Sequence, residues 1–183
     1  MRIAVLLTLC VLATPSSAAD NKYIYPDAVT TTFEPNDAAS EKQGVKQCQL
    51  SVTPVKLSQG VDLRVKMLSQ GQTVFYVLTL DVAEFTVSNG IPYDPKKRPI
   101  TSFRIISNIF ETGPQMKLVD MHDGGMGMAL DQGSFISVLK LVQRGDYMIA
   151  FKPVGALDET VYVIRPGVDQ QPMDQFATCL RQM

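Results

Sequence analysis

The chain is poor in the residues that most often build catalytic centres. It contains no tryptophan, one histidine and three cysteines among its 183 residues. With only His122 available, a serine or cysteine nucleophile has little choice of general base. Neither a Gly-x-Ser-x-Gly elbow, nor a glycine-rich phosphate loop, nor a His-Glu-x-x-His motif occurs. We therefore expect a protein that is not an enzyme and that uses no cofactor.

An excess of charge of either sign is also absent. Lys and Arg number 17 and Asp and Glu number 18, so the formal net charge is -1 at pH 7. A nearly neutral chain creates no long-range field that would collect nucleic acid or anionic lipid. The one basic cluster, Lys96-Lys97-Arg98, lies between prolines and is typical of a solvated loop. We expect no nucleic-acid partner.

The first residues form the longest apolar run. MRIAVLLTLCVLATPSSAAD has one early charge at Arg2, an apolar stretch from Ile3 to Ala13, and small residues at Ser17-Ala18-Ala19. This order is typical of a secretory signal peptide, and the run is shorter than the ~20 residues of a membrane span. The sequence predicts a cleaved signal peptide over residues 1–19, a mature chain from about Asp20 without a transmembrane segment, and a periplasmic or secreted location.

Two cysteines remain after the predicted cleavage, Cys48 and Cys179. Exported thiols meet an oxidising compartment, so an even pair is typical of a disulfide. We predict a bridge between them. In the chain-entropy model its long closed loop stabilises the fold by roughly 4–5 kcal/mol, before any strain is subtracted. The alternative is two buried free thiols.

Residues 20–44 show no sustained hydrophobic period. They mix turn-forming and charged residues in DNKYIYPDAVTTTFEPNDAASEKQG. This composition predicts a flexible arm that proteases cut early. Its aromatic residues Tyr23, Tyr25 and Phe33 can either anchor a binding partner or pack back onto the rest of the protein.

From Val45 onward the hydrophobic period is mostly two, which is typical of β-strands. In VDLRVKML, residues 61–68, apolar and charged residues alternate. Gln70-Gly71-Gln72 predicts a hairpin turn, and TVFYVLTLDV after it is apolar on both faces, as in a central strand. Further strand candidates are QCQLSV, EFTVS, SFRIIS, QMKLVDM and GMGMALD.

Two segments have helical spacing instead. SFISVLKLVQRG and PMDQFATCLRQM carry apolar residues three and four positions apart. Asp131 or Ser134 can cap the start of the first helix and Gly145 suits its end, while Pro172 suits the first position of the second helix. DYMIAFKP and ETVYVIRP predict a paired hairpin between them. The sequence thus predicts one mainly β domain over residues 45–183, an antiparallel sheet or sandwich with two short helices, one of them C-terminal.

The run ALDQGSFISVLKLVQRGDYMIAF resembles the C-terminal half of the invasion-associated locus B family of small exported bacterial proteins. The shared pattern is a Leu-Asp step, an apolar helix ending in a basic residue and Gly, two strands and a closing helix, over about the last third of the chain. The chain departs from the family in lacking tryptophan and in having Gly127-Met128 where a Gly-Cys step is common. The resemblance implies an envelope or host-interaction role and supplies no catalytic residues.

The stretch VDMHDGGMGMALD allows two interpretations of the single histidine. His122, Met126 and Met128 are ligands that suit monovalent copper in an oxidising compartment. A strand–turn–strand explains the same residues, with Asp123-Gly124-Gly125 in the turn and both methionines on the core face.

These features together predict an exported, non-catalytic, β-rich protein that binds another macromolecule, a protein of the cell envelope or outside the cell. Tyr23, Tyr25 and Phe33 are its candidate contact residues. A periplasmic copper-binding protein that uses His122 and the two nearby methionines is the second hypothesis. A hydrolase with a pair of carboxylates acting as general acid and base is the third.

Overall fold

The computed structural model describes residues 22–35, 44–56, 58–88, 91–112, 118–120, 125–165 and 169–183. The larger of two sheets contains β2 (Ala28–Glu34), β3 (Val45–Lys56), β4 (Gln59–Gln70), β5 (Thr73–Ser88), β6 (Ile91–Lys97), β8 (Leu118–Asp120) and β9 (Met126–Leu130). The smaller sheet contains β1 (Lys22–Ile24), β7 (Ile100–Ile106), β10 (Tyr147–Pro153) and β11 (Thr160–Ile164). The described helices are α2 (Gln132–Arg144) and α3 (Gln170–Arg181).

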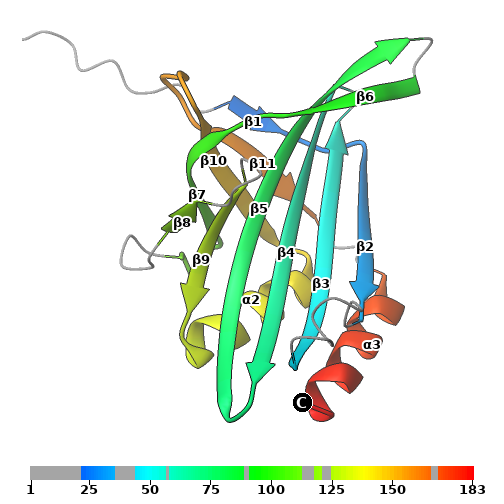
Figure 1. Ribbon diagram of the computed structural model, residues 1–183. Coiled ribbons are helices and arrows are strands. Elements are labelled where there is room, and N and C mark those ends of the chain that lie inside the picture. The colour runs from blue at the N-terminus through cyan, green and yellow to red at the C-terminus, as the bar shows by residue number, and fades with distance from the viewer. Residues whose placement is uncertain are drawn as a thin grey trace, which may run out of the picture.

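The two sheets lie one behind the other, with the helices at one end (Figure 1). The strand order is β2-β3-β4-β5-β9-β8 in the large sheet, with β6 also paired to β5, and β1-β11-β10-β7 in the small sheet. All of these pairs are antiparallel except β1 with β11. The predicted mainly β fold with antiparallel sheets and two helices, one of them C-terminal, is confirmed.

The alternating sequence of β4 fixes which face of the large sheet is buried. Val61, Leu63 and Val65 are buried, whereas the polar residues between them are half-buried on the opposite face. β4 pairs with β5 from Gln59↔Glu84 to Gln70↔Thr73, and the predicted hairpin turn contains Gly71 with φ 61°. A positive φ suits glycine, which lacks a Cβ atom.

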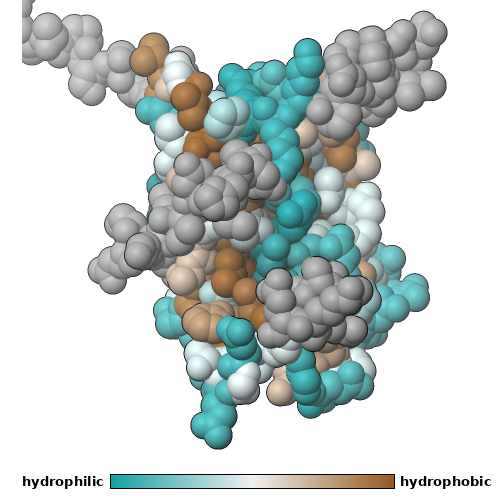
Figure 2. Space-filling view, viewed as in Figure 1, coloured by the Kyte–Doolittle hydropathy of each residue, from teal (hydrophilic) through white to brown (hydrophobic). Residues whose placement is uncertain are grey.

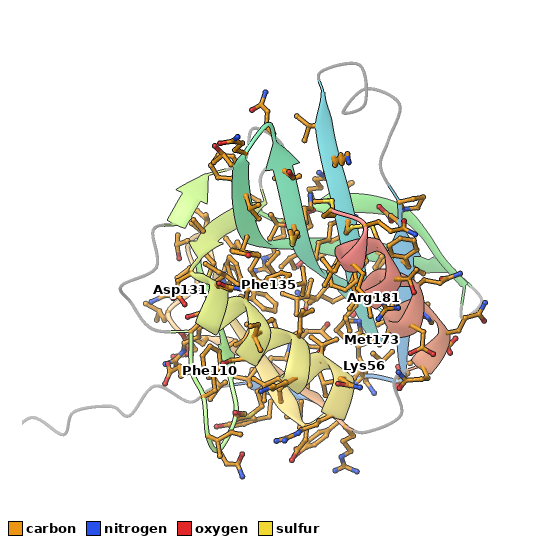
Figure 3. The ribbon with its side chains drawn as sticks, turned by 90° about the horizontal axis from the view of Figure 1, so that it is seen from below. Lys56, Phe110, Asp131, Phe135, Met173 and Arg181 are labelled. Atoms are coloured by element: carbon orange, nitrogen blue, oxygen red, sulfur yellow. A yellow bond between two sulfur atoms is a disulfide. The ribbon has the colours of Figure 1, made fainter. Side chains whose placement is uncertain are left out.

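The core lies between the inner faces of the two sheets. Leu63 and Leu80 from the large sheet and Ile149 and Tyr162 from the small sheet have no exposed surface. Figure 3 shows the helices from below, where they cover the end of the sandwich, with Phe135 of α2 and Met173 of α3 among the buried residues. Burial of these side chains is the main favourable term in folding.

Both helices begin at an aspartate. Of the two predicted caps of α2, Asp131 is the one used: its carboxylate accepts the Ser134 N–H at 2.9 Å. Gly145 ends α2 with φ 64°, as predicted. Asp169 caps α3, so Pro172 is the third residue of that helix and not the first. Proline is tolerated there because the first turn has no intrahelical acceptor for its N–H.

The prediction of a flexible arm over residues 20–44 is wrong for Lys22–Ile24 and Ala28–Glu34, which form β1 and β2, while residues 20, 21 and 36–43 of the predicted arm lie outside the described residues. β1 pairs with β11, and β2 pairs with β3 over seven residues. The inward-facing Val29, Thr31 and Phe33 follow a period of two that the surrounding turn-forming residues obscure. Three consecutive threonines also favour a strand, because β-branched side chains suit the pleated surface.

The basic cluster Lys96-Lys97-Arg98 was predicted as a loop, but its two lysines end strand β6, which is paired with β5 from Ser88↔Ile91 to Ala83↔Lys97. The two prolines of β6 are compatible with a strand because, among the described strands, β6 pairs with β5 alone, and proline lacks the N–H that pairing on a second side would need. Among the helices that the structure describes, none is both long and apolar enough to cross a bilayer.

Candidate functional site

Two tyrosines, Tyr23 in β1 and Tyr25 directly after it, are exposed at the edge of the small sheet. Tyr23 is 57% and Tyr25 is 52% exposed. The guanidinium carbon of Arg165, which follows β11, lies 5.0 Å from the centre of the Tyr25 ring, within the range of a cation–π interaction. We call Tyr23, Tyr25 and Arg165 the aromatic edge.

The local sequence explains why these rings point outward. Tyr23 points away from the core because its neighbour Ile24 packs against the core, and Tyr25 on the other side of Ile24 is exposed just after the strand ends. β1 is held by pairing with β11 and by the bond from Lys22 N–H to Glu159 O at 3.1 Å. The strand therefore presents the Tyr23 ring from a paired backbone, and Tyr25 follows directly after it.

The two arginines near this edge differ in their partners. Arg104 lies in the same cross-strand row as Tyr23 and donates to Glu159 at 2.6 Å and to Glu111 at 2.7 Å. These hydrogen bonds, that to Glu159 foremost, raise the pKa of Arg104. Arg165 has no carboxylate partner among the described residues. Its charge is available to a ligand, whereas that of Arg104 is already neutralised.

Phe33, the third predicted contact residue, lies elsewhere. It is half-buried at the end of β2 and packs against Phe176 of α3, with ring centroids 6.5 Å apart. It also forms part of an open groove of about 660 Å³ between β2 and α3. The structure thus brings Tyr23 and Tyr25 together and separates Phe33 from them.

The outer face of the large sheet carries a cluster of charges that sequence reasoning did not identify. Figure 2 shows a band of hydrophilic residues on this face. Arg64 Nη2 lies 2.6 Å from Asp62 Oδ2, and Arg64 Nη1 lies 3.1 Å from Asp81 Oδ2. The register places Asp62 opposite Asp81 and so brings residues of β4 and β5 to one guanidinium. The alternation in β4 predicted the polar face and the glycine turn predicted that β4 pairs with β5, but the exact register that aligns Asp81 with Asp62 was not predicted.

The charge states in this cluster have clear physical causes. Burial lowers the pKa of Arg64, but the nearby charge of Asp62, its hydrogen bond and the charge of Asp81 outweigh burial, so the pKa is raised. Burial also lowers the pKa of Lys66, and the charge of Arg64 lowers it further. No hydrogen-bond or ion-pair partner of Lys66 lies in the described part of the chain. Asp62, Arg64 and Asp81 are therefore joined by ion pairs, and the Lys66 ammonium beside them is in a less favourable environment.

The two carboxylates of this cluster share one cation. Asp62 and Asp81 both lie against the Arg64 guanidinium, and Asp62 Oδ1 also accepts the Thr53 hydroxyl at 3.5 Å. This geometry favours a structural ion-pair network on the sheet surface.

The predicted cysteine pair joins β3 to α3. Cys48 and Cys179 are at disulfide distance, with Cα atoms 6.0 Å apart and a sequence separation of 131. Cys48 is fully buried in β3, and Cys179 lies on the side of α3 that faces it. The bridge fixes the C-terminal helix to the large sheet.

The proposed copper ligands are only partly described. His122 and the predicted turn residues Asp123 and Gly124 lie outside the described residues. Met126 and Met128 face Leu80 and Leu78 across the β5–β9 pair. Met128 is buried and Met126 packs partly against the core. β8 and β9 pair antiparallel on either side of this segment, as the strand–turn–strand interpretation predicts.

Comparisons of the chain with models of protein families, with curated proteins and with solved structures find no significant match. The resemblance of the C-terminal third to the invasion-associated locus B family stays a prediction.

Proposed function

We propose that this is an exported, non-catalytic protein that binds a protein of the cell envelope or outside the cell through its aromatic edge. One observation carries the proposal: two tyrosines that are more than half exposed stand beside an arginine without a carboxylate partner among the described residues. Tyrosine and arginine are the residues, with tryptophan, that most often dominate the energy of protein interfaces.

The position of these residues supports binding over a purely structural role. A tyrosine side chain has few rotatable bonds and loses little conformational entropy when it is covered, so its buried area adds to affinity. Arg165 contributes a charge that is held against an aromatic ring and can pair with a carboxylate of the partner. The expected partner surface is apolar with at least one acidic group.

Export is supported by the cysteine pair. Disulfides form and persist in oxidising compartments and are rare in the cytosol. The N-terminal apolar run followed by Ser17-Ala18-Ala19 provides the signal. Mass analysis of protein from the periplasm or culture medium should give a mature N-terminus near Asp20. Uncleaved protein that stays in the cytosol would contradict this part of the proposal.

The binding surface is tested by affinity capture with matched variants. Immobilised wild-type protein and the Tyr23→Ala/Tyr25→Ala double variant are exposed to the same envelope extract, and retained proteins are quantified. Phe75→Ala is the control, because Phe75 is also an exposed aromatic residue, at 49%. A partner retained by wild type and control should fall at least about tenfold with the double variant. Equal retention by all three proteins would exclude the aromatic edge as the contact surface.

A further inference from the structure

β2 stands at one end of the large sheet, and its outer edge has no strand beside it among the described residues (Figure 1). It pairs with β3 in an unbroken register from Ala28↔Val55 to Glu34↔Gln49. α3 packs against β2 through Phe176 and Phe33, and Phe33 is one of the core-facing residues of β2. Such an edge exposes a row of backbone donors and acceptors that can template a further strand.

The other edges that the structure describes carry features that oppose strand addition. β1 and β8 are each three residues long, and β6 contains two prolines and two lysines. At β7 the chain folds back: Ile105 N–H donates to the Thr112 hydroxyl at 2.8 Å, and Thr112 N–H donates to Ile105 O at 2.9 Å. β2, with the sequence AVTTTFE, has no proline, no lysine and no bulge.

We propose that β2 pairs antiparallel with β2 of a second copy of this chain, about a two-fold axis through Thr31. This register keeps the core-facing residues of both copies on one side of the joined sheet. A shift by one residue would place core-facing side chains opposite outward-facing ones. A shift by two residues would leave some of the seven positions unpaired.

The sequence of β2 is complementary to itself in this register. Val29 faces Phe33 of the other copy, and Thr30 faces Thr32. A β-branched residue opposite an aromatic one, and threonine opposite threonine, are favourable cross-strand pairs. Val29 and Phe33 are half-buried within one copy, so pairing covers more of their apolar surface. This self-complementarity favours a second copy over a strand of another protein.

Charge does not oppose the contact. Glu34 is the one charged residue of β2 and faces Ala28 of the other copy, and within its own chain it accepts a hydrogen bond from Gln49 Nε2. The formal net charge of the whole chain is -1, so two copies repel each other little at a distance. The interface is isologous, because each copy offers the same strand, and it closes as a dimer.

Sedimentation velocity of the purified protein tests the dimer. Wild type should pass from monomer to dimer between about 1 and 100 µM, the range expected of a small interface. Thr30→Lys/Thr32→Lys should stay monomeric with an unchanged circular dichroism spectrum, since both threonines are exposed and lysine protects edges. Thr73→Lys, an exposed strand position on the β4–β5 hairpin, should dimerise like wild type. A wild-type protein that is monomeric throughout, or a lysine variant that still dimerises, would overturn the proposal.

Cysteine crosslinking tests the register separately. Thr30→Cys and Thr32→Cys chains lie opposite each other only in the proposed antiparallel pairing, at the Cα separation of about 4.5–5.5 Å that suits a disulfide. Mild oxidation of a mixture of the two variants should give a crosslinked heterodimer, and either variant alone should give far less. Equal crosslinking in the mixture and in the single variants would show another contact or random collision. Crosslinking of β2 to a different protein in place of a second copy would also overturn the proposal.

Discussion

Phe33 of β2 packs edge-on against Phe176 of α3, with an interplanar angle of 64°. The contact joins a strand near the beginning of the described chain to the C-terminal helix, two segments that are far apart in the sequence. Because the disulfide and this ring pair both attach α3 to the large sheet, the helix is an integral part of the fold.

Replacing either ring should lower the free energy of unfolding. Phe176 is 1% exposed, so Phe176→Ala should cost about 3–5 kcal/mol. Phe33→Ala should cost less, because Phe33 is half-buried. Urea unfolding of both single variants and the double variant should give a coupling of about 0.5–1.5 kcal/mol. Strictly additive effects would show that the two rings do not interact.

Removing the Cys48–Cys179 bridge should destabilise the protein without abolishing the sheets. The bridge closes a loop with a sequence separation of 131 residues, and loss of such a constraint costs about 2–5 kcal/mol. Urea unfolding of wild type and of Cys48→Ala/Cys179→Ala measures the loss, and far-ultraviolet circular dichroism checks the strands. Peptide mapping without reductant should find no free thiol in exported protein. Two titratable thiols there would contradict the bridge.

The cap of α2 should make stability depend on pH. Hydrogen bonds from the side chain and backbone of Ser134 lower the pKa of Asp131. A carboxyl group with a lower pKa in the folded state stabilises the fold at neutral pH, and this contribution is lost as pH falls through the folded-state pKa. Asp131→Ala should thus be less stable than wild type at neutral pH, with the difference shrinking below about pH 4.

Urea unfolding of wild type, Asp131→Ala and Asp131→Asn at several pH values measures this effect. Asparagine keeps the acceptor without the charge, so the difference between Asp131→Asn and Asp131→Ala should change little with pH. If the difference in unfolding free energy between wild type and Asp131→Ala stayed constant in acid, the ionised carboxylate of Asp131 would not be what stabilises the start of α2.

Met128 should behave as a core residue. It is 2% exposed and faces Leu78, so Met128→Ala should cost about 2–5 kcal/mol, and Met126→Ala should cost less. A copper site predicts another pattern: the variants would leave the metal-free protein nearly unchanged and lose an ion-dependent rise in melting temperature. Thermal melts of these variants and His122→Ala with and without monovalent copper separate the two hypotheses.

The elements that the sequence predicted best were those with strong local signals. The alternation in β4, the glycine of the β4–β5 turn, and Asp131 and Gly145 at the ends of α2 each act through a few adjacent residues. The pairing of Cys48 with Cys179 followed from there being two cysteines outside the predicted signal peptide. These interactions do not depend on knowing the strand order.

The parts that escaped prediction depend on contacts between distant segments. β1 is stabilised by pairing with β11, and β2 by pairing with β3. The alternation of inward- and outward-facing residues within each of these two strands is too short to predict a strand from the sequence. The Arg64 cluster needs the register of β4 against β5 to bring Asp81 beside Asp62. The sequence did not predict whether Tyr23 and Tyr25 are exposed, because an aromatic residue without a known neighbour can pack inward or outward.

Photo-crosslinking in cells that produce the protein tests the binding surface most directly. A photoreactive phenylalanine analogue is placed at Tyr23, at Tyr25 or at the control position Phe75, all of which are exposed. The proposed function predicts a discrete crosslinked product with one partner protein at both tyrosine positions and none at Phe75. No product at either tyrosine, or the same product at all three positions, would contradict the claim that the aromatic edge is where this protein binds.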